Sequence, residues 1–179
     1  MRRKGSKGWI AAARRVPSPN FDARPRGVSV SLLVVHCISL PPGRFGGDSI
    51  ERFFTNRLDP DADPYFKTIH SMKVSAHFVV RRDGELLQFV ALDQRAWHAG
   101  VSSWRGRTRC NDFSVGVELE GTDDGEFAPA QYDRLRELVH VLRKHLPLRD
   151  VAAHSDVAPG RKTDPGAHFD WARLLAAVS

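Results

Sequence analysis

Three residues of this chain, His36, His154 and Asp164, combine side-chain types that bind catalytic zinc with positions where they could meet at one site. His36 closes the apolar run 32–35, His154 closes the run 151–153, and Asp164 follows in a turn-rich stretch. Structural zinc usually has four protein ligands, whereas catalytic zinc keeps three and activates a water whose pKa falls to about 7. The three residues therefore predict a zinc site with one open position, which is typical of a hydrolase.

Each of these residues also has a purely structural interpretation. A histidine at a strand end is often a half-buried imidazole bonded to backbone. The sequence Asp164-Pro165-Gly166 is ordinary turn chemistry, so Asp164 is either a ligand or an outer partner of the site. The combination favours the metal site, and the spacing alone leaves the role of Asp164 open.

Two carboxylates are candidates for the general base that such a site needs. The segment 113–120 alternates, so Glu118 and Glu120 share the face opposite the apolar residues of a predicted strand. A carboxylate fixed on a strand can accept a proton from the attacking water. Glu120 lies about 7 Å further along the strand, so we favour Glu118. The alternative is that Glu118 is an ordinary surface residue of the strand.

Lys162 lies two residues before Asp164, within reach of a carbonyl oxygen held at the metal. A fixed cation there stabilises the negative charge that the oxygen gains in the transition state. A solvated loop lysine is the alternative interpretation.

The order of predicted elements is mixed α and β. We expect a buried strand at 30–36 followed by a long loop through Gly46-Gly47, a hairpin of 77–82 and 85–90 joined by a type I′ turn at Asp83-Gly84, and a strand at 151–154. Helices are expected at 48–54, 65–71, 129–145 and 170–178. The apolar residues predicted to face inward from the last helix are Trp171, Leu174, Leu175 and Val178.

With 179 residues, of which 41% are hydrophobic, the chain suits one domain over residues 1–179, with 1–29 wrapping its surface. No apolar stretch approaches the ~20 residues of a membrane span. Arg14 and Arg15 interrupt the apolar stretch near the N-terminus, so we expect no signal peptide and a cytoplasmic protein. Cys37 and Cys110 are then reduced thiols, with a disulfide as the second interpretation.

The net charge of +6 raises the question of a nucleic-acid partner. The basic residues are spread along the chain without a nucleic-acid-binding motif, so we predict no nucleic-acid partner. The charge instead favours solubility and attraction for a small acidic substrate.

Several long sequence motifs, in the same order and spacing, closely resemble those of the zinc amidase superfamily, which includes phage lysozyme-type amidases and peptidoglycan recognition proteins. The resemblance spans almost the whole chain. Among the strings that carry it are Arg14-Arg15-Val16-Pro17-Ser18-Pro19, Leu33-Val34-Val35-His36, Arg95-Ala96-Trp97-His98-Ala99-Gly100, Arg109-Cys110-Asn111-Asp112-Phe113-Ser114, Val117-Glu118-Leu119-Glu120-Gly121-Thr122-Asp123 and Arg161-Lys162-Thr163-Asp164-Pro165-Gly166.

The resemblance implies an α/β (α+β) fold, with a central mixed β-sheet flanked by helices and a zinc cleft at one face. It implies Zn²⁺ held by His36, His154 and Asp164. Glu118 then matches the catalytic acid and base, and Lys162 the residue that stabilises the tetrahedral intermediate. The implied substrate is a small anhydro-muropeptide, cut between the lactyl group and L-alanine during cytoplasmic peptidoglycan recycling, which limits β-lactamase induction. We expect a monomer.

The resemblance also proposes substrate contacts. Arg109 matches an arginine that binds the acidic peptide stem, and Trp97 either packs on the sugar or fills core. Cys37 stands where the family has a substrate-contacting asparagine, so one polar contact is weakened. Because neighbours on a strand point to opposite faces, we do not expect Cys37 to bind the same ion as His36.

Two rival functions remain open at this stage. One is an amidase that acts on intact peptidoglycan, and the absent signal peptide disfavours its exported form. The other is a muropeptide-binding module without catalysis, which the full set of three ligands and two helper residues disfavours.

Overall fold

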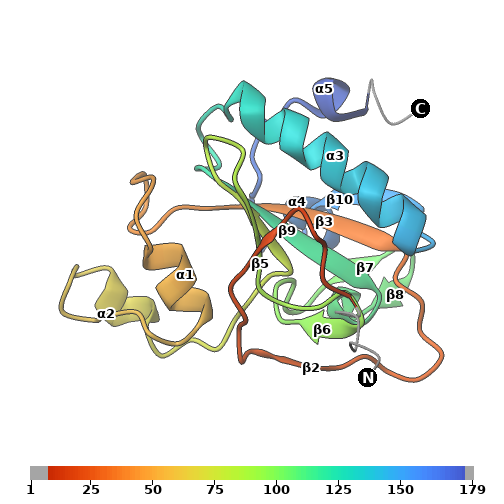
Figure 1. Cartoon of the computed structure of the whole chain (residues 1–179), viewed down its shortest axis with the longest axis horizontal. Coiled ribbons are helices and arrows are strands. Elements are labelled where there is room, and N and C mark those ends of the chain that lie inside the picture. The colour runs from red at the N-terminus through yellow and green to blue at the C-terminus, as the bar shows by residue number, and fades with distance from the viewer. Residues whose placement is uncertain (1–7, 176–179) are drawn as a thin grey trace, which may run out of the picture.

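A six-stranded sheet forms the centre of the protein in this computed structural model, which describes residues 8–175 (Figure 1). The strands follow the order β1-β5-β4-β9-β3-β10. They are β1 (Arg14–Arg15), β5 (Leu86–Gln88), β4 (Phe78–Val80), β9 (Ser114–Glu120), β3 (Leu32–Ile38) and β10 (Asp150–Ala153). Strands β4, β9, β3 and β10 run parallel, while β5 runs antiparallel to β4. The predicted mixed sheet is confirmed.

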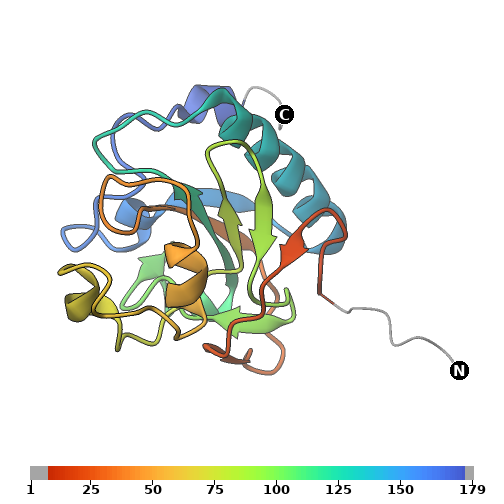
Figure 2. The same ribbon diagram turned by 60° about the vertical axis from the view of Figure 1, so that its left-hand side comes forward.

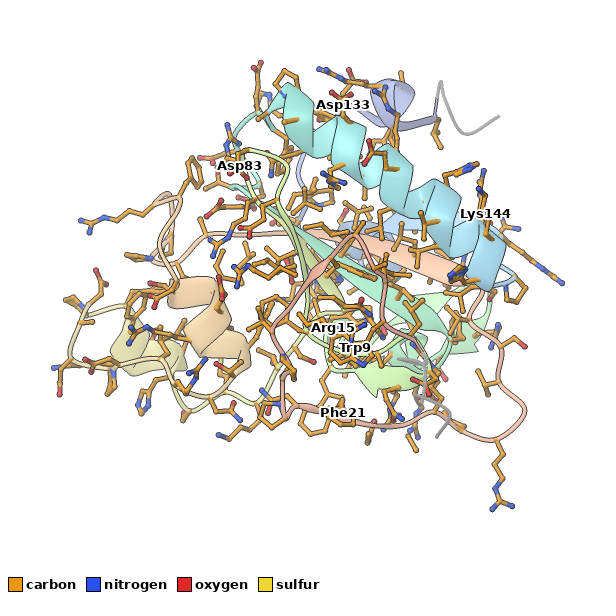
Figure 3. All side chains as sticks on the ribbon, in the orientation of Figure 1. Trp9, Arg15, Phe21, Asp83, Asp133 and Lys144 are labelled. Atoms are coloured by element: carbon orange, nitrogen blue, oxygen red, sulfur yellow. The ribbon has the colours of Figure 1, made fainter. Side chains whose placement is uncertain are left out.

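The helix α3 (Pro129–His145) covers one face of this sheet, with the bounds predicted from its apolar spacing. Its buried side chains pack against Leu33, Val35 and the alternate apolar residues of β9. Asp133 and Lys144 lie on the exposed side of the helix (Figure 3). The apolar face of β9 therefore points to α3, and its carboxylate-bearing face points away.

The C-terminal helix α5 (Trp171–Leu175) packs beyond α3. Leu174 is fully buried, as predicted. Leu175 is 48% exposed, so its inward assignment was wrong, because the neighbouring position turns away from α3. Val178 lies outside the described residues.

Two short helices, α1 (Ser49–Phe54) and α2 (Phe66–Ile69), form a second apolar cluster with β4 and β5. Asp48 occupies the N-cap position of α1, as predicted. Its carboxylate, however, accepts a hydrogen bond from Arg52 at 2.7 Å instead of capping a backbone N–H. Helix α2 is shorter than the predicted 65–71.

The hairpin of β4 and β5 is confirmed, but its predicted turn type is wrong. A type I′ turn needs positive φ at both central residues, and of Asp83 and Gly84 only Gly84 has it, with φ +87°. Gly84 N donates to Arg81 O, and Asp83 Oδ1 accepts from Glu85 N. The aspartate side chain thus closes the turn while Gly84 provides the left-handed position.

Several short elements on the face of the sheet opposite α3 were not predicted. They are β2 (Phe21–Ala23), β6 (Gln94–Ala96), β7 (Ser103–Trp104), β8 (Arg107–Thr108) and the 3₁₀ turn Cys110–Asp112. β2 pairs with β6, and β7 with β8. Segments of two or three residues are too short for a period to be read from sequence. The last strand, β10, ends at Ala153, so His154 begins the short helix α4 (His154–Val157).

The N-terminal segment runs along the sheet edge, where β1 pairs with β5 (Figure 2), and Arg24 anchors its later part. The Arg24 guanidinium donates to the carbonyls of Leu92, Asn111, Asp112 and Ser114 at 2.9–3.2 Å. Burial lowers the pKa of Arg24 to about 10. Arg24 therefore ties this segment to the backbone that enters β9. Within residues 8–175, no helix is both long and apolar enough to span a membrane.

We predict that Arg24→Met lowers the free energy of unfolding by on the order of 3 kcal/mol, because several buried carbonyls lose a charged donor. Urea unfolding monitored by circular dichroism measures the change. Arg24→Lys serves as the matched control and should remain destabilised, since one ammonium does not reach all four carbonyls. Stability equal to that of the unaltered protein in both variants would contradict this role for Arg24.

Candidate active site

Strand register places three of the candidate residues side by side. His36 on β3 is the register partner of Glu118 on β9, and Val35 is the partner of Ala153 on β10. His154, the residue after Ala153, therefore lies beside His36 on the side of β3 away from β9. Paired residues of adjacent parallel strands lie about 4.8 Å apart and point to the same face. The shared face is the one opposite α3, and the site forms where these strands end.

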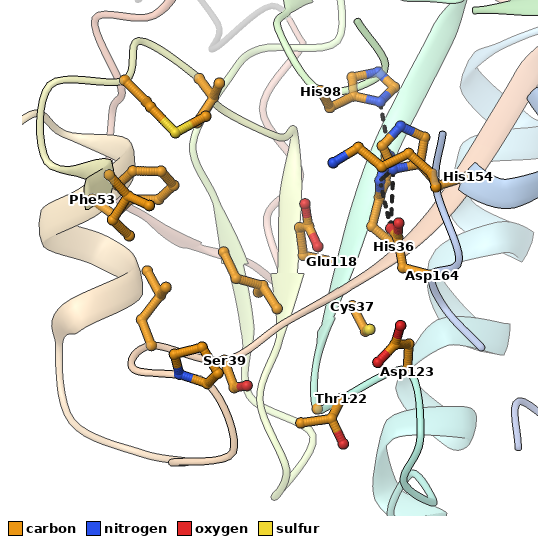
Figure 4. Close-up of a pocket in the computed structure, with 18 of the residues that line it drawn as sticks. His36, Cys37, Ser39, Phe53, His98, Glu118, Thr122, Asp123, His154 and Asp164 are labelled. Carbon is orange, nitrogen blue, oxygen red and sulfur yellow. Dashed lines mark hydrogen bonds and ion pairs between the residues drawn. The ribbon is translucent and has the colours of Figure 1, made fainter. Parts of the chain in front are cut away.

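The three predicted metal ligands converge (Figure 4). His36 Nδ1 and His154 Nδ1 are 2.9 Å apart, and Asp164 Oδ2 lies 3.2 Å from the first and 3.0 Å from the second. Tetrahedral zinc, with bonds near 2 Å, separates its ligand atoms by about 3.3 Å. Two imidazoles and one carboxylate also form a donor set that zinc prefers. The residues present thus fit a zinc ion.

The protonation of the cluster suits a cation at its centre. Burial lowers the pKa of His36 to about 4, so its imidazole is neutral near pH 7. Burial alone would raise the pKa of Asp164, but hydrogen bonds with His154 and His36 outweigh it and hold this pKa well below its usual value. Lone pairs and a carboxylate therefore face one another, an arrangement that a bound cation stabilises.

The far nitrogens of both histidines also have partners. His36 Nε2 lies 2.9 Å from His98 Nδ1, and His154 Nε2 lies 3.3 Å from Ala99 O. Such outer contacts fix the ring orientation of metal-binding histidines. Sequence reasoning assigned His98 no role, although His98 stands in one of the recognised strings.

The loop that carries Lys162 and Asp164 is attached to the loop after β9. Thr163 Oγ1 donates to Asp123 Oδ2 at 2.5 Å, and a Cβ at Gly166 would lie 1.8 Å from Asp123 O. Gly166 also has φ +93°, a conformation that favours glycine. The close approach therefore requires glycine, and Asp123 is a supporting residue that sequence reasoning missed.

Glu118 lines the same cleft and lacks a protein partner. Its Oε2 is the one buried side-chain nitrogen or oxygen in residues 8–175 without a hydrogen bond. Burial raises the pKa of Glu118 well above its usual value, the charge of Asp164 adds to this, and Lys162 partly opposes it. Lys162 also lines the cleft. Its positive charge favours the ionised form of Glu118, which is the form that a general base needs.

Glu120, the competing carboxylate, has a structural environment. Its Oε1 accepts from Arg81 at 3.0 Å and from Gly46 N at 2.6 Å, and its Oε2 accepts from Arg82 N at 3.2 Å. These contacts tie the loop after β3 to the sheet. Glu120 does not line the cleft that holds Glu118.

The cleft around these residues has a volume of about 540 Å³ and two unlike walls. The apolar wall comes from α1, α2 and the neighbouring loops, and it includes Leu40, Phe53, Tyr65, Ile69 and Met72. The opposite wall is polar and comes from the loops that hold Thr122, Asp123, Arg161, Lys162 and Thr163. A ligand with one apolar or sugar face and one charged face suits this shape.

The three predicted substrate contacts differ in placement. Trp97 and Cys37 line the cleft. Burial raises the pKa of the Cys37 thiol, so it stays protonated. Arg109 does not line the cleft; its side chain is 70% exposed and pairs with Asp112 at 3.2 Å.

Comparison with known proteins identifies the family. A family model described as N-acetylmuramoyl-L-alanine amidase matches residues 26–167. The chain belongs to this amidase family. The 1,6-anhydro-N-acetylmuramyl-L-alanine amidase AmpD of Citrobacter freundii is 55% identical to the chain over 175 residues, which is 97% of this chain and 94% of that protein.

Solved structures agree with this membership. A crystal structure of a selenomethionine AmpD derivative matches the amidase with a TM-score of 0.94 and 55% identity, covering 97% of this chain and 98% of that one. The Escherichia coli amidase AmiD, in complex with anhydro-N-acetylmuramic acid-L-Ala-D-γ-Glu-L-Lys, matches with a TM-score of 0.62 and 28% identity, covering 87% and 60%. The predicted family, fold and enzyme class are therefore confirmed.

We predict that Glu118→Gln changes how the stability of the amidase depends on pH. Because the folded-state pKa of Glu118 is raised, the unfolded chain loses this proton first as the pH rises. The free energy of unfolding therefore falls with pH up to the folded-state pKa. Glutamine does not ionise, so the variant lacks this fall and gains stability relative to the unaltered protein as the pH rises from about 5 to about 8.

Urea unfolding at both pH values, with chelator present, measures this difference. Glu120→Gln is the matched control. It removes the charge from a buried ion pair with Arg81 and should lose on the order of 3 kcal/mol at both pH values. If the free energy of unfolding depended on pH equally in Glu118→Gln and the unaltered protein, the pKa of Glu118 would not be raised by folding.

Proposed function

We propose that this amidase hydrolyses the amide between the lactyl group and L-alanine of 1,6-anhydro-muropeptides, with zinc held by His36, His154 and Asp164. The observation that carries the proposal is that three convergent metal-binding atoms and one carboxylate with an unpartnered buried oxygen meet in a single cleft. The 55% identity to the Citrobacter freundii anhydro-muramyl amidase supports the choice of substrate.

The chemistry divides among few groups. Zinc, when bound, supplies a Lewis acid that polarises the amide carbonyl and makes water a better nucleophile at neutral pH. Glu118 accepts the proton of the attacking water and delivers it to the amine nitrogen of the leaving L-alanine. The Lys162 ammonium stabilises the negative charge that develops on the carbonyl oxygen.

The raised pKa of Glu118 supports its double role. A carboxyl that ionises with difficulty holds a proton well once it has received one, and so is able to return it to the leaving amine. The neighbouring Lys162 charge favours the ionised form before water attacks. Glu118 is thereby suited to act first as base and then as acid.

The two walls of the cleft suit the two halves of the substrate. We assign Trp97 to the sugar side and Cys37 to the position beside the scissile amide, as members of the cleft lining. Arg109 is assigned to the peptide carboxylates and must reach them from its exposed position outside the lining. Guanidinium and carboxylate pair bidentately, which gives this contact its direction.

We infer that the amidase acts as a monomer in the cytoplasm on muropeptides released by cell-wall turnover, and that it thereby limits β-lactamase induction. Support comes from the near full-length similarity to the Citrobacter freundii enzyme. A binding module without catalysis is disfavoured, because the ligand set and Glu118 are both in place.

Mass spectrometry of anhydro-muramyl tripeptide incubated with zinc-loaded amidase tests the substrate. We expect release of free tripeptide, which chelator abolishes and added zinc restores. A muramyl tripeptide with a reducing end is the matched substrate, and we expect it to be cleaved more slowly. Equal cleavage of both would indicate a broader wall amidase, and cleavage of neither would refute the proposal.

Two substitutions test the assigned mechanism. Glu118→Gln should lower kcat by roughly 10²–10⁴-fold, and Lys162→Met by about 10²–10³-fold. Zinc content, measured by atomic emission, should stay at the level of the unaltered amidase in both. Glu120→Gln, compared at a temperature where it remains folded, should retain most of its kcat. Full turnover in Glu118→Gln would remove this residue from the mechanism.

A further inference from the structure

We propose that His98 is a positioning residue of the metal site, which holds the His36 ring through a chain that runs from His36 to His98 to Ser114. The inference rests on the proposed zinc site and adds to it a residue to which no role in the reaction has been given. The observations that carry it are the contacts of both His98 ring nitrogens, the space that Gly116 leaves, and the anchoring of His98 by Asn111.

The contacts form an unbroken line from the metal ligands into the protein. His36 turns Nδ1 toward His154 and Asp164, and its Nε2 lies 2.9 Å from His98 Nδ1. The other ring nitrogen of His98, Nε2, lies 3.2 Å from Ser114 Oγ. Figure 4 shows the contact between the His98 and His36 rings, with Asp164 on the opposite side of the His36 ring.

The direction of these hydrogen bonds follows from the use of His36 Nδ1. A nitrogen that binds a metal has no proton, so the proton of a neutral His36 lies on Nε2. Nε2–H then donates to His98 Nδ1, which leaves the His98 proton on its own Nε2, from which it donates to Ser114 Oγ. One tautomer of each ring satisfies every contact, and this tautomer presents the His36 lone pair to the metal.

Gly116 provides the space in which His98 lies. A Cβ at this position of β9 would meet His98 Cγ at 2.5 Å and Nδ1 at 2.6 Å. No positive φ is involved at Gly116, so the requirement for glycine comes from the ring and not from the backbone conformation. Strand β9 therefore has no side chain at Gly116, two residues before Glu118, and the His98 ring occupies this space.

Asn111 links both histidine ligands to one anchor. Its Oδ1 accepts from His98 N at 3.2 Å and from Ala99 N at 2.9 Å. The His98 side chain then contacts His36, while Ala99 O contacts His154 Nε2. Two consecutive residues therefore orient the two ligands, and one asparagine side chain fixes their backbone.

The substitutions His98→Leu and His98→Asn test the proposal. Leucine removes the acceptor for His36 Nε2–H, whereas the asparagine Oδ1 can replace His98 Nδ1. We expect His98→Leu to weaken zinc binding by ~10–100-fold and His98→Asn to recover most of that loss. Zinc dissociation constants from competition with a chromophoric chelator measure both effects without substrate.

Gly116→Ala tests the same contact without changing either ring. The added methyl displaces His98, so zinc binding should weaken as in His98→Leu. The visible absorption of the Co²⁺-substituted protein gives a second readout, because its band positions and intensities report ligand geometry. We expect the spectrum to change in His98→Leu and Gly116→Ala and to be largely restored in His98→Asn.

Leu142→Ala is the matched control for general loss of stability, since Leu142 is fully buried in α3 on the opposite face of the sheet. Its thermal stability should fall while its zinc affinity and Co²⁺ spectrum stay unchanged. Zinc affinity in His98→Leu equal to that of the unaltered protein would overturn the inference, as would an equal loss in Leu142→Ala. If the unaltered protein bound no zinc, the proposed metal site itself would fail.

Discussion

The site depends on the parallel register of β3 between β9 and β10. This register sets His36 beside Glu118 and puts His154 at the next position across the sheet. A slip by one residue would turn His36 toward α3 and put Cys37 in the place of His36 beside Glu118. The apolar residues that alternate with these groups secure the register, because Leu33, Val35 and Val117 are completely buried under α3. Core packing on one face thereby fixes chemistry on the other.

The same arrangement places charged and polar groups where they have little access to solvent. Glu118 has a buried oxygen without a partner, and two imidazole nitrogens and a carboxylate oxygen face one another within 3.2 Å. Such groups destabilise a fold unless a proton, a cation or a substrate compensates them. The rest of the sheet supplies the opposing stability through the α3 core and through anchors such as Arg24 and the Glu120–Arg81 pair.

Much of this architecture could be predicted from the sequence, because local patterns determine it. The alternation in β9 indicated the face of Glu118, and the apolar spacing of α3 gave its bounds. The ligand set itself came from residue types at strand ends together with resemblance to a family. In the structure one atom of each of these three residues lies within 3.2 Å of the other two.

The remaining features arise from contacts between distant segments. His98 meets His36 across 62 positions, and Thr163 meets Asp123 across 40, and no local pattern encodes such pairs. The turn at Asp83-Gly84 was assigned the wrong type because an aspartate side chain replaced a second left-handed residue. Arg109 matched a family string, yet the structure leaves it outside the cleft lining, where sequence alone gives no position.

The attachment of Gly46 to Glu120 has a consequence for how this enzyme can diversify. Strand β9, which carries Glu118, also holds the far end of the loop that starts after β3, through Glu120 two residues later. That loop is therefore fixed at both ends, and its middle contributes Leu40 and Pro42 to the apolar wall. Residues 42–45, between the two fixed points, are exposed, so they can change in size and polarity without disturbing buried packing. Substrate preference and catalytic chemistry can thus evolve separately within one fold.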